Sequence, residues 1–338
     1  MITQDDQSLY WLMVLTYVVT TSSQTILINL AKVNGKIQFS SLSVVLMSEA
    51  LKLTFSVVMF VYRHLTASKP VVYPSKRVLI LYSVPSILYM INNNLITHSQ
   101  NYMDPASWQI LGNLKIVATA VMYKLVINRH ITRRKSIGVF LLFLAGVVNS
   151  LGALKADGDE VHFDEVFITH TGVGIVLVYC IFSGVAGVYT EAILKKYKTM
   201  SIHVQNFVMY SFGIAINGFG SVVFRSLGKD GDASGFFDGF NKWTWCVILL
   251  SAVTGLVVSF FLKVASNITR LVLIGVSTLG TSILSYIVFG YQLTLSFHVS
   301  FVITLLSLYF MYEPPTDVTV NEPALNLPRY RSQSQRRL

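Results

Sequence analysis

Long apolar runs recur along nearly the whole chain of 338 residues, and they constrain its fold more than any other feature. A bilayer core about 30 Å thick requires about 20 apolar residues per helix. By this length criterion the sequence predicts ten membrane-spanning helices, at Leu9–Ala31, Ser41–Tyr62, Val78–Ser99, Pro105–Ile127, Ile137–Leu151, Gly172–Leu194, Val204–Leu227, Trp243–Val264, Leu271–Phe289 and Leu295–Tyr312.

Composition supports an all-α protein embedded in a lipid bilayer. Hydrophobic residues make up 53% of the chain and charged residues 12%, and the mean hydropathy is +0.58. No water-soluble domain of useful size remains between the runs. The formal net charge of +10 is not read as a sign of a nucleic-acid partner, because the basic residues lie in short loops between the expected spans.

The distribution of Lys and Arg predicts the orientation of the chain. Seventeen of these residues lie in the loops that follow the even-numbered spans and in the C-terminal tail, whereas six lie in the opposite loops. Basic loops stay on the cytosolic side of a membrane, so both termini are expected to be cytosolic. Residues 1–312 are expected to form one transporter domain, and residues 313–338 a disordered cytosolic tail.

Short connections leave little mass outside the membrane, so any binding site is expected among the helices. Ten spans divide into five plus five, with halves at about 1–155 and 156–312. Because five is odd, the second half would enter the membrane inverted, as in the inverted repeats of many secondary transporters.

The sequence argues against an enzyme and against a metal or cofactor site. Cys180 and Cys246 each lie inside an apolar run, which provides neither a disulfide framework nor a zinc site. Catalysis would require paired carboxylates or metal ligands at a membrane face. Asp104 and the scattered acids of the loop at 156–165 do not provide them.

Lys115 is the most informative polar residue, because it lies near the middle of an expected span. A Lys at that depth costs about 2.5 to 3.5 kcal/mol on insertion scales, and an unpaired one normally faces a water-filled cavity or an anionic ligand. We therefore expect Lys115 to bind an anion. In the same span, Trp108 is either an interfacial anchor or a stacking surface for a base.

Other polar positions keep two interpretations each. Glu49 and Lys52, three residues apart on one helical face, form either a structural ion pair or part of a cavity. Asn93, one turn beyond Tyr89, either lines a cavity or bonds a neighbouring helix. Pro85 removes one backbone hydrogen bond and permits a bend.

The second half carries a further set of candidates. Ser183, Gly184 and Gly187 have the small-residue spacing of close helix packing, and they could also expose backbone to a flat aromatic ligand. Asn206 and Tyr210 lie at i and i+4, on one face of one helix.

Two positions lie at the expected cytosolic boundary. Arg270 is either a positive-inside residue or a phosphate ligand. Asn267 opens a glycosylation sequon but is expected to face the cytosol, which excludes that modification.

Several ordered motifs resemble those of the nucleotide-sugar transporters, in the branch that carries CMP-sialic acid, UDP-galactose and UDP-N-acetylglucosamine. The similarity runs from about Leu9 to Tyr312, and its most specific pieces are SEALK (48–52), VPSILYMINNN (84–94), YMDPASWQILGNLKI (102–116), SGVAGVYTE (183–191) with QNFVMY (205–210), and TGLVVSFFLK (254–263) with SNITR (266–270).

The resemblance implies a ten-helix inverted repeat that exchanges a pyrimidine nucleotide sugar for its nucleoside monophosphate across the Golgi or endoplasmic reticulum membrane. It assigns nucleotide contacts to Tyr89, Asn93, Trp108, Lys115, Ser183, Gly184, Gly187, Asn206, Tyr210 and Arg270. Trp108 replaces a usual Tyr and Arg270 a usual Lys. Gly112 replaces a larger residue, which leaves the sugar pocket unassigned.

Two rival interpretations and the oligomeric state stay open at this stage. The same architecture could carry another small phosphorylated or organic metabolite. The chain could also be a non-transporting membrane partner, which would tolerate the loss of Lys115. The sequence does not decide between a monomer and a homodimer.

Overall fold

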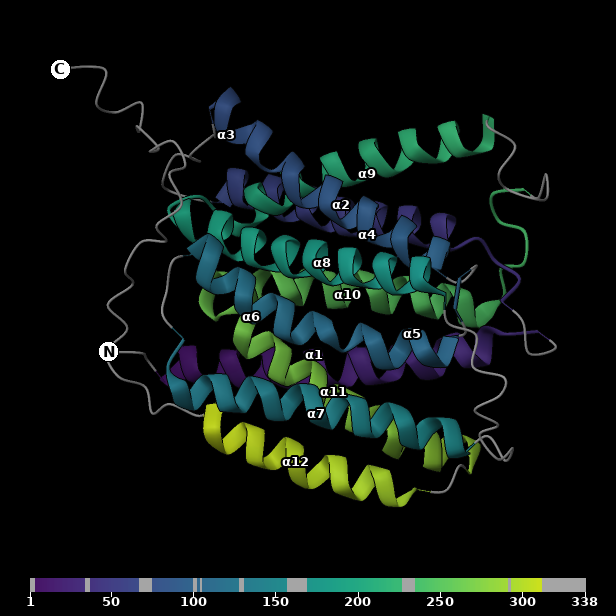
Figure 1. Ribbon diagram of the computed structural model, residues 1–338. Helices are drawn as coiled ribbons and strands as arrows, with labels where there is room; N and C mark the ends of the chain where they lie inside the picture. Colours follow the sequence, from purple (N-terminus) through teal and green to yellow (C-terminus); the bar gives the residue numbers. More distant parts are fainter. Residues whose placement is uncertain are drawn as a thin grey trace. The chain divides into compact units, whose positions relative to one another are not determined.

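Apolar helices dominate the structure, a computed structural model that describes residues 4–33, 37–66, 75–99, 102–103, 105–127, 131–156, 169–226, 235–290 and 293–311. Every regular element in these ranges is an α-helix (Figure 1). The helices are α1 (Gln4–Ala31), α2 (Ser41–Thr66), α3 (Lys76–Leu81), α4 (Ser83–Ser99), α5 (Pro105–Gly112), α6 (Leu114–Ile127), α7 (Arg133–Ala156), α8 (His170–Lys196), α9 (Ile202–Ser226), α10 (Lys242–Val264), α11 (Asn267–Phe289) and α12 (Leu295–Met311). The expected tail at 313–338 lies outside the described residues.

Seven helical segments of the described chain are long and apolar enough to cross a membrane. They are α1, α2, the run Ile110–Ile127, α7, α8, α10 and α11, and α12 is a shorter apolar helix. The expectation of an all-helical membrane protein is therefore confirmed. Each of the ten expected spans corresponds to one helix or to two successive helices, but the count of ten and the inverted repeat stay predictions.

Two of the expected spans are each divided into two helices. The span predicted at Val78–Ser99 is interrupted at Tyr82, between α3 and α4. Pro85 lacks the N–H that would bond to the carbonyl of Leu81, which explains the break at this place. The span predicted at Pro105–Ile127 is interrupted at Asn113, between α5 and α6.

The first compact unit comprises the described parts of Met1–Ile87 and Ile193–Val264. Within it, α1 packs along α10, and α2 packs along α9 and α10. One buried core cluster of this unit joins Ala31, Phe39, Val44, Val247 and Ile248.

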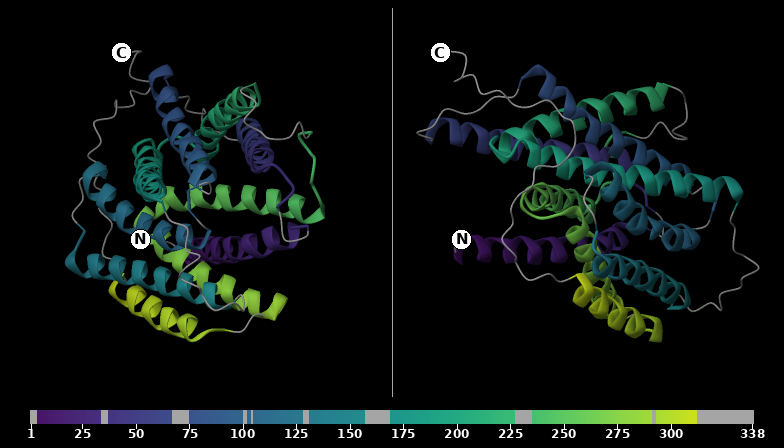
Figure 2. Two further views of the ribbon diagram at one scale, coloured as in Figure 1. Left: turned by 45° about the vertical axis from the view of Figure 1, so that its right-hand side comes forward. Right: turned by 60° about the vertical axis from the view of Figure 1, so that its left-hand side comes forward.

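The second compact unit comprises Leu88–Ala192 and Ala265–Leu325. Its α7 and α12 lie side by side, as Figures 1 and 2 show, and α5, α6 and α11 also pack on α7. Its largest core cluster includes Ile116, Tyr123, Leu142, Val188 and Leu271. Each unit takes helices from both halves of the sequence, so the compact units differ from the expected division near residue 155.

Candidate functional site

The break between α5 and α6 determines the position of Lys115. The N–H of Asn113 donates to the carbonyl of Ile110 (3.2 Å), and the N–H of Ile116 donates to the carbonyl of Asn113 (3.0 Å), so the chain makes a turn there. Lys115 is consequently the second residue of α6. The first turn of a helix presents backbone N–H groups and the positive end of the helix dipole. A discontinuous membrane helix uses such an end to bind anionic groups.

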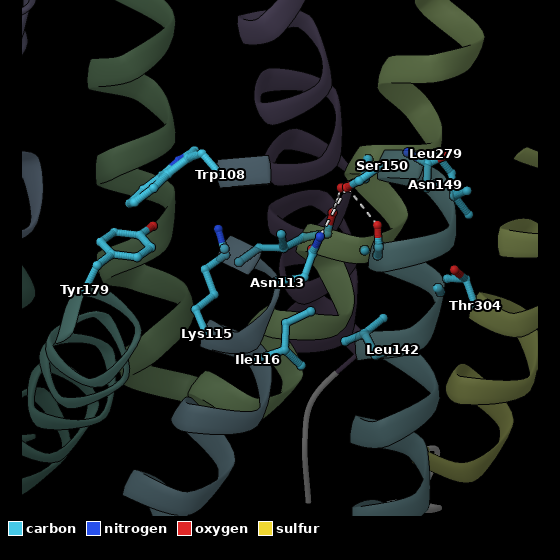
Figure 3. Close-up of a pocket in the computed structure, with 16 residues that line it drawn as sticks. Trp108, Asn113, Lys115, Ile116, Leu142, Asn149, Ser150, Tyr179, Leu279 and Thr304 are labelled. Atoms are coloured by element: carbon cyan, nitrogen blue, oxygen red, sulfur yellow. Dashed lines mark hydrogen bonds between the residues drawn. The ribbon is translucent and has the colours of Figure 1, made fainter. Parts of the chain in front are cut away.

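The larger of two cavities in the second unit has a volume of about 360 Å³. Trp108 and Tyr179 flank it with ring centroids 5.0 Å apart. Figure 3 shows the Lys115 side chain extending toward Trp108, with Tyr179 on one side and Asn113 on the other. Cavities of several hundred cubic ångströms with aromatic walls and a few polar groups are typical of small-molecule sites.

A smaller cavity of about 210 Å³ lies in the same unit. Its polar lining consists of Tyr89, Asn92, Lys115, Thr119, Tyr179, Ser183, Asn267 and Arg270. The two cavities share Lys115, Tyr179 and Ile274, so they adjoin at these side chains.

Lys115 is half-buried and lines both cavities. Among the residues that the structure describes it forms no ion pair, and the smaller cavity adds a second cation, Arg270. Lys115 therefore brings a positive charge to the shared edge of the two cavities, where it could meet an anionic ligand, and Arg270 brings a second positive charge to the smaller cavity alone.

Two asparagines that line the smaller cavity were not among the predicted ligand contacts. Asn92 is 5% exposed and Asn267 is 2% exposed, and the amide oxygen of each has no hydrogen-bond partner among the described residues. A buried acceptor without a partner is costly, so such atoms call for an explanation. Because both residues line a cavity, a ligand that donates hydrogen bonds would satisfy them.

From the sequence, Asn267 was expected only to open a glycosylation sequon that faces the cytosol. Asn267 is buried, and its backbone N–H donates to Glu191 Oε2 at 2.7 Å. That bond fixes the start of α11, where Ser266 caps the helix by accepting from the N–H of Thr269.

The glycines of α8 allow close helix packing, as their spacing predicted. A Cβ added to Gly184 would lie 3.1 Å from the backbone Cα and N of Thr119 in α6. A Cβ added to Gly187 would lie 2.6 Å from Asn267 Nδ2. These glycines thus hold α8 close to the helix that carries Lys115 and to the Asn267 side chain.

Asn206 and Tyr210 lie in the first unit and are not among the residues that line the two cavities. Both side chains lie on one face of α9, as their spacing predicted, and that face packs on α10. Asn206 Nδ2 donates to Ser259 Oγ at 2.8 Å, and the Tyr210 hydroxyl donates to the carbonyl of Gly255 at 3.3 Å. Asn206 is fully buried, and its amide oxygen has no partner among the described residues.

The predicted ion pair between Glu49 and Lys52 is present in the same unit. Lys52 Nζ also lies 4.8 Å from the centroid of the Tyr210 ring. The structural interpretation of this pair is thus confirmed.

Five of the ten predicted contacts meet at the two cavities, namely Tyr89, Trp108, Lys115, Ser183 and Arg270. Gly184 and Gly187 support the helices around them. The side chain of Asn93 lies outside the described residues.

Comparisons with known proteins agree with these features. The sequence model of the nucleotide-sugar transporter family matches residues 5–313. The probable UDP-sugar transporter protein SLC35A4 of Xenopus tropicalis is 41% identical over 307 residues, 90% of this chain and 92% of its own. CMP-sialic acid transporter 1 of Oryza sativa subsp. japonica is 33% identical over 311 residues, 90% of this chain and 94% of its own.

One solved crystal structure has a similar fold. It matches with a TM-score of 0.64 over 90% of this chain and 97% of its own length, at 10% sequence identity. At that identity the match supports the fold alone.

Proposed function

The chain belongs to the nucleotide-sugar transporter family, and on that premise we propose that it moves a pyrimidine nucleotide sugar into the Golgi or endoplasmic reticulum lumen in exchange for the nucleoside monophosphate. The proposal includes ten spans in a five-plus-five inverted repeat, a homodimer and cytosolic termini, each of which goes beyond family membership. Relatives of this chain are named as carriers of UDP-sugars and of CMP-sialic acid, which supports a pyrimidine base.

The position of Lys115 is the observation that carries the proposal. A half-buried cation that has no ion pair among the described residues, in the first turn of a broken membrane helix and at the edge of two cavities, suits a phosphate. Arg270 supplies further positive charge beside the smaller cavity. An Arg presents a planar set of donors that matches phosphate oxygens.

The smaller cavity suits the nucleoside. Tyr89 offers an aromatic face for a base, and the buried amide oxygens of Asn92 and Asn267 accept hydrogen bonds from N–H or hydroxyl groups. Ser183 adds a hydroxyl on the α8 side. Asn206 and Tyr210 remain proposed contacts, to be tested by substitution in the same assays.

Exchange follows from the shared chemistry of the two substrates. A nucleoside monophosphate has the same base and ribose and a phosphate, so it can satisfy the same groups that hold the nucleotide sugar. The monophosphate lacks the transported sugar, which would occupy the rest of the site.

Uptake into proteoliposomes tests the proposal. Vesicles preloaded with UMP, CMP or GMP are supplied with labelled UDP-, CMP- or GDP-sugars, and we expect uptake only for a pyrimidine nucleotide sugar with its own monophosphate inside. Lys115→Ala should abolish that uptake. Lys124→Ala, at an exposed position in the last turn of the same helix, is the matched control and should leave it intact.

Uptake that persists in Lys115→Ala would refute the assigned role of the lysine. Uptake of a phosphorylated metabolite without a base, and of no nucleotide sugar, would refute the proposed substrate.

A further inference from the structure

The larger cavity has one cationic wall, and the rest of its lining is neutral. Apart from Lys115, none of the described residues that line it is charged, and its polar members include Asn113, Asn149, Ser150, Thr278 and Thr304. Lys115 lies at the edge shared with the smaller cavity, so the opposite end of the larger cavity presents only uncharged polar groups. A ligand group that enters this end meets no counter-charge.

The hydroxyl protons at this end are already engaged within the helices. Ser150 Oγ donates to the carbonyl of Gly146 (2.9 Å), Thr278 Oγ1 to the carbonyl of Ile274 (3.0 Å), and Thr304 Oγ1 to the carbonyl of Ser300 (2.8 Å). The dashed lines of Figure 3 show part of this network at Ser150. A hydroxyl whose proton is engaged still accepts hydrogen bonds, so the oxygens of Thr278 and Thr304 offer acceptor sites to a ligand. Ser150 Oγ already accepts one hydrogen bond from Asn113 Nδ2 at 3.1 Å and has one further acceptor position.

Asn149 complements these acceptors with a donor group. Its amide oxygen accepts from Ser300 Oγ at 3.3 Å, which leaves its NH₂ group to donate. A cavity wall with several hydrogen-bond acceptors and one amide donor suits sugar hydroxyls, because each hydroxyl both donates and accepts hydrogen bonds. A carboxylate only accepts, so it would face acceptor oxygens and would be buried without a cation.

Gly112 leaves room for the same group. A Cβ added at this position, which lines the cavity, would meet no heavy atom within 4 Å. The space beside Gly112 is therefore ligand space and not a packing contact. Trp108 and Tyr179 close the adjacent side with flat apolar faces.

From these features we propose that the larger cavity is the sugar subsite and that it selects an uncharged, hydroxyl-rich sugar over one that carries a carboxylate. This inference rests on the proposed function and adds to it the chemical class of the transported sugar. Gly112 sets the size limit of the subsite, and the acceptor wall of Ser150, Thr278 and Thr304 sets its preference for hydroxyl groups.

A matched pair of ligands tests the charge preference directly. UDP-glucose and UDP-glucuronate differ only at the sugar C6, where the glucuronate carries a carboxylate. If the wild-type protein binds CMP more tightly than UMP, the corresponding pair of cytidine nucleotides is used instead. In titrations of the purified full chain, we expect the glucose form to bind at least about tenfold more tightly, since a buried unpaired carboxylate is costly. Equal affinity, or tighter binding of the glucuronate form, would overturn the inference.

Substitution of Gly112 tests the location of the subsite. Gly112→Leu should weaken binding of the glucose form by about tenfold or more and leave binding of the monophosphate unchanged, because it fills only the sugar space. Gly174→Leu is the matched control, because a Cβ there also meets nothing within 4 Å and the residue lines neither cavity. It should change neither affinity.

The outcomes separate the inference from the proposed function. If Gly112→Leu leaves the glucose form unaffected, or weakens the monophosphate equally, the subsite assignment is wrong while nucleotide binding stands. If the wild-type chain binds no pyrimidine nucleotide, the proposed function is wrong and the inference falls with it.

Discussion

Lys52 and Lys115 each lie within an apolar helix of this chain, and their surroundings differ. Lys52, in the first unit, is 8% exposed, pairs with Glu49 and lies over the ring of Tyr210. Lys115, in the second unit, lines two cavities and has no ion pair among the described residues. The first charge is neutralised within the protein, whereas the second is available to a ligand.

The contrast extends to neighbouring groups. A Cβ on Gly255 would lie 2.8 Å from Lys52 Cδ, whereas one on Gly112, beside the larger cavity, would meet nothing within 4 Å. The amide oxygens of Asn206 and Asn267 both lack a partner among the described residues, but Asn206 bonds Ser259 through Nδ2, whereas Asn267 lines the smaller cavity. On the proposed function, the polar groups around Lys52 serve packing, and those around Lys115 serve binding.

Removal of each lysine should give the largest difference between the two regions. Lys52→Ala leaves Glu49 without its partner and should lower the free energy of unfolding by about 3 to 5 kcal/mol. Lys115→Ala should lower it by less than about 1 kcal/mol, because the unpaired charge is itself costly in a membrane. Unfolding of both variants in detergent measures this.

The double variant Glu49→Gln with Lys52→Met serves as the control for the first region. It removes both charges and should recover most of the lost stability. Equal destabilisation by Lys52→Ala and Lys115→Ala would contradict the claim that the two lysines have different roles.

The two glycines should differ by a smaller amount. Gly255→Ala forces the Lys52 stem to move and should destabilise by about 1 to 3 kcal/mol, the usual cost of overpacking. Gly112→Ala fills open space at the end of a helix and should change the free energy of unfolding by no more than about 1 kcal/mol, in the stabilising direction because Ala has the higher helix propensity. An equal loss of stability in Gly255→Ala and Gly112→Ala, measured by thermal unfolding, would contradict the account.

The two asparagines should show the smallest effects, and in different assays. Asn206→Ala loses its bond to Ser259 and should destabilise by about 1 kcal/mol. Asn267→Ala removes an unsatisfied oxygen and should keep stability within about 0.5 kcal/mol, while nucleoside monophosphate affinity falls about tenfold. If Asn267→Ala binds the monophosphate as tightly as the wild type, the smaller cavity does not hold the nucleoside.

Hydropathy and charge at single positions were sufficient to predict the helical membrane fold and to single out Lys115, which lines two cavities in the structure. The same runs predicted a continuous helix at Pro105–Ile127, because Gly112 and Asn113 interrupt the apolar pattern too briefly to indicate a break. That break places Lys115 in a first helical turn. Such a position depends on tertiary contacts, including the bond from Asn113 Nδ2 to Ser150 Oγ at 3.1 Å.

Asn92 and Asn267 were missed for a related reason. A sequence shows that an amide is present, but only coordinates show that its oxygen is buried and unsatisfied. The i, i+4 spacing of Asn206 and Tyr210 did predict their common face, and the structure adds that this face packs on α10.

The most direct test of the central claim is the contribution of the phosphate to binding. The affinities of uridine and UMP, or of cytidine and CMP, are measured by titration for the wild-type chain, Lys115→Gln and the control Lys124→Gln. The account predicts that the wild type and the control bind the monophosphate far more tightly than the nucleoside, and that Lys115→Gln loses most of this preference. An undiminished phosphate preference in Lys115→Gln would contradict it.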